Sequence, residues 1–133
     1  MKIDSIAAAW APRLLSVLRI ITAFLFIAHG TQKFFSFPAP PQRAVELASL
    51  IGLAGALELV GGTLVLVGLF TRPVAFVLSG FMAVAYFMAH APQWFWPILN
   101  RGELAILYCF VFLYLSAAGG GPWSLDRALR KAG

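Results

Sequence analysis

The chain has 133 residues, of which 61% are hydrophobic and only 11% are charged. Soluble domains carry about a quarter charged residues, and so short a chain cannot bury this much apolar side chain in one aqueous core. The composition therefore excludes an ordinary soluble protein and predicts a single integral membrane domain over residues 1–133.

Charge and cysteine content narrow the classes of function further. The formal net charge is +5, but the basic residues are spread between apolar segments. They form no stripe interleaved with base-stacking aromatics, which argues against nucleic acid as a partner. Basic flanks of this kind suit contact with the lipid bilayer and its headgroups. The one cysteine, Cys109, excludes an internal disulfide and a dithiol redox pair.

Four apolar segments follow one another along the chain, at about 14–35, 50–70, 74–91 and 104–118. A helix needs about 20 residues to cross the hydrocarbon core of a bilayer. Long apolar runs without strict alternation indicate helices rather than barrel strands. We therefore predict an all-α fold, an integral membrane four-helix bundle. A signal peptide ending near "IAHG", at 27–30, is an open alternative for the first segment.

The joints between the segments are rich in proline, glycine or tryptophan. "FPAPPQR" at 37–43 separates the first two segments, and a tryptophan-rich loop at 91–100 precedes the fourth. The stretch "SLDRALRKAG" at 124–133 indicates a short basic amphipathic tail. Four spans place both termini on one side of the membrane, and that side carries more Lys and Arg. We therefore expect a multi-pass protein of a bacterial inner membrane with both termini in the cytoplasm.

Glu58 is the sharpest polar signal, because it lies eight residues after Leu50 inside the second apolar segment. A carboxylate in lipid is expensive, so it should face the bundle interior and have a partner. The first two segments run in opposite directions, which brings His29 to a similar height, in the outer half of the bundle. We predict that His29 and Glu58 form a buried pair that exchanges protons. Arg19, near the inner leaflet, is expected to snorkel to lipid phosphate.

Further polar residues are expected at the same outer end of the bundle. Lys33 lies one turn beyond His29 on the same helix face. Five residues are predicted to bind a ligand beside the catalytic pair of Glu58 and His29, namely Gln32, Lys33, His90, Asn100 and Glu103. No cluster has the spacing of a metal site. Three interpretations stay open: a quinone headgroup site, a haem b held by His29 and His90, or a polar cluster that only fixes helix packing.

Four motifs in order carry a resemblance to a known family. They are "HGTQK" at 29–33, "GALELVGGTLVLVGLFTR" at 55–72, "NRGELAILY" at 100–108 and "GGGPWSLD" at 119–126. Together they resemble the DoxX family of small bacterial four-span membrane proteins, over nearly the whole chain. The resemblance points to His29, Gly30, Lys33, Glu58, Gly61, Gly62, Arg72, Asn100, Glu103, Ser124 and Asp126. Among these, we take Gly61, Gly62, Arg72 and Asp126 as structural.

The resemblance also implies a link to sulfur and redox metabolism, because the family name derives from subunits of a thiosulfate:quinone oxidoreductase. We therefore predict a quinone-linked or redox-associated membrane subunit that receives electrons from a soluble or peripheral partner. The chain has no Rossmann glycine pattern and no dithiol, so whether it is itself an enzyme stays open. A non-catalytic membrane scaffold and a small transport or permeability factor are the alternatives, and a homo-oligomer is also open.

Overall fold

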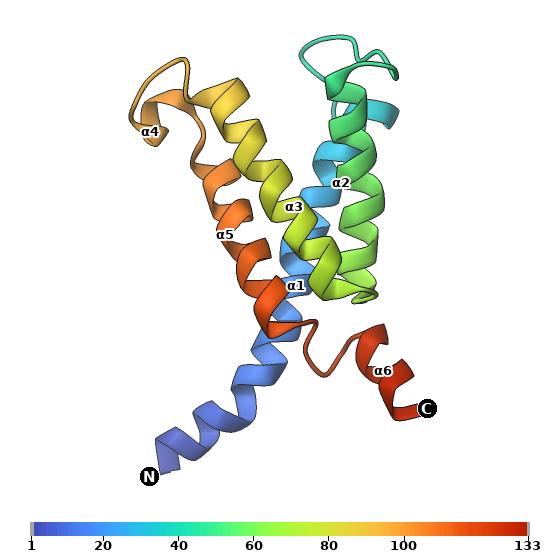
Figure 1. The fold of residues 1–133 in the computed structure, drawn as a ribbon, viewed down its shortest axis with the longest axis vertical. Coiled ribbons are helices and arrows are strands. Elements are labelled where there is room, and N and C mark those ends of the chain that lie inside the picture. Colours follow the sequence, from blue (N-terminus) through green and yellow to red (C-terminus); the bar gives the residue numbers. More distant parts are fainter. Residues whose placement is uncertain (1, 133) are drawn as a thin grey trace. The chain divides into compact units, whose positions relative to one another are not determined.

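The computed structural model describes residues 2–132 and confirms the predicted all-α membrane fold (Figure 1). No strand occurs among these residues. The elements in chain order are α1 (Lys2–Phe35), α2 (Leu50–Val67), α3 (Thr71–Ala85), the π-helix η1 (Tyr86–His90), α4 (Pro97–Asn100), α5 (Glu103–Ala118) and α6 (Leu125–Ala132).

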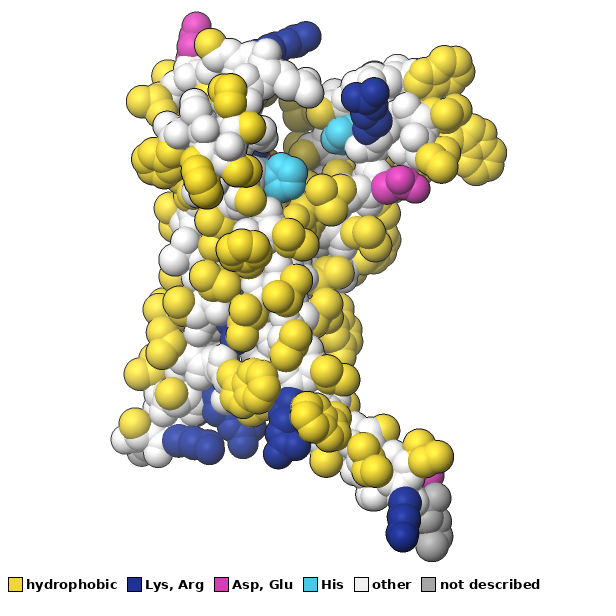
Figure 2. Space-filling view, turned by 180° about the vertical axis from the view of Figure 1, so that it is seen from behind, with side chains coloured by type: hydrophobic (Ala, Val, Ile, Leu, Met, Phe, Trp, Pro, Cys, Tyr) yellow, Lys and Arg dark blue, Asp and Glu magenta, His cyan; other side chains and the backbone are white. Residues whose placement is uncertain are grey.

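Three helical stretches are long and apolar enough to cross a membrane: Lys2–Phe35, Leu50–Val67 and Thr71–His90. Glu103–Ala118 is a fourth apolar helix, and it is shorter. Yellow hydrophobic side chains cover most of the face seen in Figure 2. Exposed apolar side chains on this scale mark a surface that contacts lipid rather than water.

The described residues fall into two compact units. The first contains the chain up to Phe70 together with the residues from Gly120 onward, and the second is Thr71–Gly119. In the first unit α1 and α2 pack side by side, and in the second α3 packs on α5 (Figure 1). That the whole chain forms a single domain stays a prediction.

Glycines set the distance between α1 and α2 in the first unit. A Cβ on Gly30 would lie 2.7 Å from Cγ of Leu59, and a Cβ on Gly62 would lie 2.7 Å from Cγ1 of Ile27. Each glycine therefore faces a branched side chain of the other helix, which would have to shift to admit a Cβ. Small residues at a helix interface let membrane helices approach closely.

Both ends of α2 are capped locally. Ser49 Oγ accepts a hydrogen bond from the backbone N–H of Gly52 at 3.1 Å, which satisfies an unpaired donor of the first turn. At the other end Gly68 has φ 72°, and the N–H of Leu69 donates to the carbonyl of Leu64 at 2.9 Å. This left-handed cap ends the helix at Val67, although the apolar sequence continues to Phe70.

Arg19 differs from its expected position. Its side chain is completely buried and does not reach lipid phosphate, so the snorkelling prediction is wrong. Nε donates to the carbonyl of Gly120 at 2.8 Å, and Nη2 donates to the carbonyl of Trp123 at 2.5 Å. Nη1 donates to the carbonyls of Val65, at 2.6 Å, and Leu66. The last carbonyls of a helix have no intrahelical partner and carry partial negative charge, so they attract this cation more strongly than a distant headgroup.

The second unit is built on contacts between α3 and α5. Ser79 Oγ donates to the carbonyl of Cys109 at 2.8 Å, and Arg72 Nη1 donates to the carbonyl of Ala117. Cys109 is a free, half-buried thiol. These contacts place the start of α3 beside the end of α5, so the two helices run in opposite directions.

Candidate functional site

The first unit contains an ion pair between its two long helices. Nζ of Lys33, in the last turn of α1, lies 2.7 Å from Oε1 and 2.6 Å from Oε2 of Glu58. Only 8% of the Glu58 side chain and 22% of the Lys33 side chain are exposed. Glu58 is eight residues after the start of α2, about 12 Å along the helix axis. The carboxylate is therefore held inside an apolar helix pair by a single ammonium group.

Gly55 makes room for this ion pair, one turn before Glu58 on α2. A Cβ on Gly55 would lie 3.3 Å from Cδ of Lys33 and 3.0 Å from Cζ of Phe34. The aliphatic part of Lys33 therefore crosses the Gly55 face of α2 on its way to the carboxylate. The Phe34 ring lies on the same face, so the ion pair has an aromatic neighbour.

His29 and Gln32 are half-buried on the same stretch of α1. His29 is one turn before Lys33, so the two side chains share a helix face. The partner that the structure gives to Glu58 is Lys33, and the predicted contact of Glu58 with His29 stays a prediction. All four residues are among those predicted from the sequence, where Lys33 has a supporting role beside Glu58 and His29.

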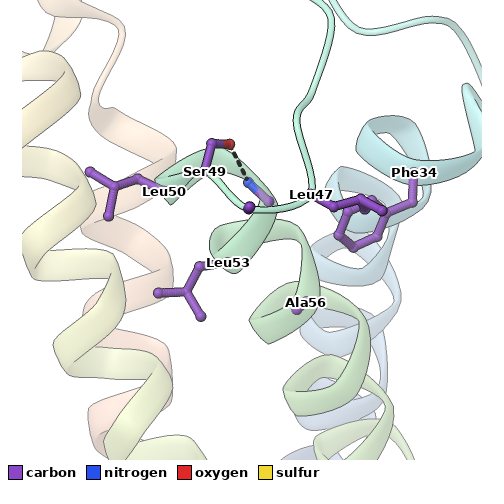
Figure 3. Close-up of a pocket in the computed structure, with 8 residues that line it drawn as sticks. Phe34, Leu47, Ser49, Leu50, Leu53 and Ala56 are labelled. Atoms are coloured by element: carbon purple, nitrogen blue, oxygen red, sulfur yellow. Dashed lines mark hydrogen bonds between the residues drawn. The ribbon is translucent and has the colours of Figure 1, made fainter.

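An apolar cavity of 590 Å³, open to the outside of the protein, lies at the start of α2 (Figure 3). It is lined by Phe34, Leu47, Ala48, Ser49, Leu50, Gly52, Leu53 and Ala56. In Figure 3 the Phe34 ring projects from α1 towards Leu47, while the Ser49 hydroxyl is engaged with the backbone of Gly52. Phe34 thus contributes to both the cavity wall and the surroundings of Lys33. An apolar ligand in the cavity would lie near the ion pair.

The second unit holds a separate polar network around Asn100. Nδ2 of this buried side chain donates to the Tyr86 hydroxyl at 3.1 Å and to the carbonyl of Trp94 at 2.9 Å. Oδ1 accepts from the N–H of Gly102 at 2.7 Å. Both amide hydrogens are therefore engaged with the protein, and Asn100 fixes the loop between η1 and α5 rather than offering a donor to a ligand.

His90 ends the π-helix η1, and its ring orientation is set by this loop. Nδ1 lies 2.9 Å from the carbonyl oxygen of Asn100, and the ring stacks on Tyr86 with centroids 6.3 Å apart. Because a carbonyl oxygen only accepts, Nδ1 of His90 is the donor in this contact. Short π-helical turns are frequent at functional sites. Glu103 is exposed at the first turn of α5.

The seven predicted site residues are thus divided between the two units. His29, Gln32, Lys33 and Glu58 belong to the first unit, and the remaining three, His90, Asn100 and Glu103, belong to the second. That all seven form one site stays a prediction. Within residues 2–132, no group of three or more His, Cys, Asp or Glu side chains could hold a metal ion.

The residues predicted to be structural lie at helix contacts and ends. Gly61 and Gly62 are buried on α2. Oδ1 of Asp126 accepts from the N–H of Phe70 at 2.8 Å, and its own N–H donates to the carbonyl of Gly68 at 2.9 Å. Asp126 therefore ties the start of α6 to the turn after α2. Arg19 also holds the end of α2 and the residues before α6, a role that was not predicted from the sequence. The feature that could have indicated a buried role is its position inside an apolar segment with no acidic residue nearby.

Comparison with known proteins agrees with these features. The family model described as DoxX matches residues 14–91. An uncharacterized protein of Haemophilus influenzae is 44% identical over 92% of this chain and 95% of its own length. The "Putative oxidoreductase CatD" of Bacillus subtilis is 30% identical, covering 83% of this chain and 82% of that protein. The inner membrane protein YqjF of Escherichia coli is 31% identical, covering 86% and 91% respectively. No solved structure matches this chain.

Proposed function

Because this chain belongs to the DoxX family of membrane proteins, we propose that it is a quinone-linked or redox-associated subunit of a bacterial inner membrane. The ion pair of Lys33 and Glu58 is its polar site. The names of two relatives support the proposal, since one is named "Putative oxidoreductase CatD" and another is named as an inner membrane protein. The charge distribution supports cytoplasmic termini.

The buried ion pair is the observation that carries the proposal. Ionised side chains within membrane helices are rare and usually mark a pathway or a binding site. Replacing a buried ion pair by apolar residues is often neutral or stabilising, so stability alone does not explain why such a pair is present. An ammonium group has three N–H bonds, and two of them suffice for the two Glu58 oxygens. The third N–H of Lys33 can donate to a carbonyl oxygen of a bound molecule.

The surroundings of the pair suit a quinone ring, which is flat and apolar and carries two carbonyl acceptors. Phe34 supplies an aromatic wall, and the cavity of 590 Å³ at the start of α2 supplies apolar volume. Lys33 supplies the donor, and Glu58 supplies an acceptor for the hydroxyl that forms on reduction. Ligand sites commonly combine apolar walls with a few polar groups in this way.

Reduction of a quinone to a quinol consumes two electrons and two protons. The chain has no dithiol and no dinucleotide-binding glycine motif, so the electrons would come from a peripheral redox protein. We propose that this chain binds and orients the quinone ring and passes protons at Glu58. His29 lies one turn before Lys33 on α1, near the same ion pair.

The test is binding of a short-chain quinone analogue to the purified, reconstituted protein. Glu58→Gln keeps the size of the side chain and removes its charge, so we expect binding to weaken by about tenfold or more, as for loss of a charged hydrogen bond. Glu46→Gln is the matched control, because Glu46 is exposed in the loop between α1 and α2. The control should bind like the parent.

Two results would reject the quinone site. If folded Glu58→Gln protein binds the analogue as the parent does, the ion pair has no part in ligand recognition. If neither the parent nor Glu58→Gln binds quinone and the variant loses helix packing, the role of the ion pair is to hold the helices together. The haem alternative has its own readout, because a Soret band in the purified protein would indicate a bound haem, for which His29 and His90 are the predicted ligands.

A further inference from the structure

The C-terminal helix α6 has two chemically different faces. With 3.6 residues per turn, its leucines at 125 and 129 and its alanines at 128 and 132 share one side. Its three cations, Arg127, Arg130 and Lys131, share the other. Leu125 is 44% exposed and Leu129 is 61% exposed. Within the part of the chain that the structure describes, the apolar face is therefore left largely uncovered.

The basic face of α6 is concentrated and only partly neutralised. The three cations line an open hollow of 280 Å³. The helix contains one acid, Asp126, and its carboxylate bonds the backbone N–H of Phe70 at the end of α2. This carboxylate is thus directed towards α2. The hollow has the charge and the room for a phosphate-sized anion.

Hydrogen bonds hold the start of α6 at the end of a membrane span. The N–H of Asp126 donates to Gly68, directly after α2, at 2.9 Å. The buried Arg19 binds the carbonyl of Trp123 at 2.5 Å. Because α2 is long and apolar enough to cross a membrane, its end lies near the boundary between lipid and water. Trp123 is 54% exposed beside α6, and tryptophan is enriched at that boundary.

We propose that α6 is a docking helix for anionic phospholipid headgroups. Leu125 and Leu129 insert at the boundary of the acyl chains, and the three cations bind lipid phosphates. A bilayer surface with anionic lipid is the occupant that satisfies both faces together, since a free phosphate would leave the leucines in water. Amphipathic helices with this pattern bind membranes through apolar burial and attraction to anionic lipid. The proposal is independent of the redox role.

A single fluorescent label on α6 tests the proposal in the full-length protein. Cys109→Ala removes the native thiol, and Ala128→Cys places the label on the apolar face without altering either leucine. The protein is reconstituted in vesicles of phosphatidylcholine alone or mixed with phosphatidylglycerol, each containing the same brominated phosphatidylcholine as a depth-dependent quencher. We expect stronger quenching with phosphatidylglycerol. Each cation should favour the docked state about fivefold at an anionic surface.

Two variants with equal loss of charge separate α6 from a general charge effect. Replacing Arg127, Arg130 and Lys131 by Gln should lower quenching in the anionic vesicles to the value in phosphatidylcholine. Replacing Lys2, Arg43 and Arg101 by Gln should leave it unchanged. Raising the salt concentration should weaken the quenching of the parent, which provides a test even if the first variant fails to fold.

Other outcomes would overturn the proposal. Equal quenching of the parent in both kinds of vesicle would remove any preference for anionic lipid. If inorganic phosphate added to phosphatidylcholine vesicles reproduces the effect of phosphatidylglycerol, α6 binds small anions and not a lipid surface. A label that stays in water in every vesicle would leave the helix available for a protein partner instead.

Discussion

The two partners of the buried ion pair should differ in what their removal costs. Lys33→Met leaves the Glu58 carboxylate without its ammonium, and only 8% of that side chain is exposed. Glu58→Leu leaves Lys33 instead, which is 22% exposed in the last turn of α1 and has a long flexible chain. Lysine can redirect its ammonium group to the headgroups, whereas glutamate is too short to do so. We therefore expect Lys33→Met to be the more damaging change.

The loss of stability in each single variant depends on where the remaining charged side chain can go. An isolated carboxylate in this position must take up a proton, which costs about 3.7 kcal/mol at pH 7 for an ordinary glutamate. Glu58→Leu should cost only about 1 kcal/mol if Lys33 reaches the interface. The double variant removes both charges and should return to within about 1 kcal/mol of the parent, because apolar replacements of buried pairs are often neutral.

Unfolding in mixed micelles of a mild detergent and dodecyl sulfate, followed by circular dichroism, measures these differences. Glu46→Leu is the control for loss of an exposed carboxylate and should change stability by less than about 0.5 kcal/mol. The reasoning is refuted if Glu58→Leu costs as much as Lys33→Met, or if the double variant is the least stable of the three. Either result would mean that the ion pair is not the energetic unit of this site.

Three further predictions concern the fold. Arg19→Leu removes the guanidinium hydrogen bonds to four backbone carbonyls and should cost at least about 3 kcal/mol in the same assay. Arg19→Lys should recover little of this stability, because its ammonium lacks the planar guanidinium fork. Gly62→Val should cost about 1–3 kcal/mol by crowding Ile27, whereas Gly80→Ala, which meets nothing within 4 Å, should stabilise α3 by about 0.5–1 kcal/mol. If both termini lie in the cytoplasm, as proposed, an impermeant thiol reagent should label Ala44→Cys from outside the cell in a Cys109→Ala background.

The positions of the long helices could be predicted because lipid leaves the backbone few alternatives. Hydropathy could not locate the ends of these helices, because it contains no information on backbone conformation. The second apolar segment continues past Gly68 to Phe70, but the left-handed glycine ends α2 at Val67. In the opposite sense, α1 begins at Lys2 because polar residues within a helix do not interrupt its hydrogen bonds.

The ion pair shows where sequence reasoning about a site stops. Heights along the helix axes placed Glu58 near His29, but they contain no information on rotation about the axis or on side-chain reach. Lysine spans more than a helical turn, so Lys33 reaches Glu58 from the next turn of α1. Arg19 was misplaced for a related reason, because its acceptors are backbone carbonyls, which a sequence does not display.

Hydrogen-bond accounting separates the two charged sites of the first unit. Arg19 and Lys33 are fourteen positions apart on α1, which is about 21 Å along the helix. Arg19 is completely buried and spends four of its five N–H donors on backbone carbonyls. No ligand can reach it, so its charge serves the fold. Lys33 remains partly exposed and retains a donor after binding Glu58. If a bound molecule meets a charge in this helix pair, it should do so at Lys33, and substitutions of Arg19 should lower stability without changing ligand affinity in the protein that folds.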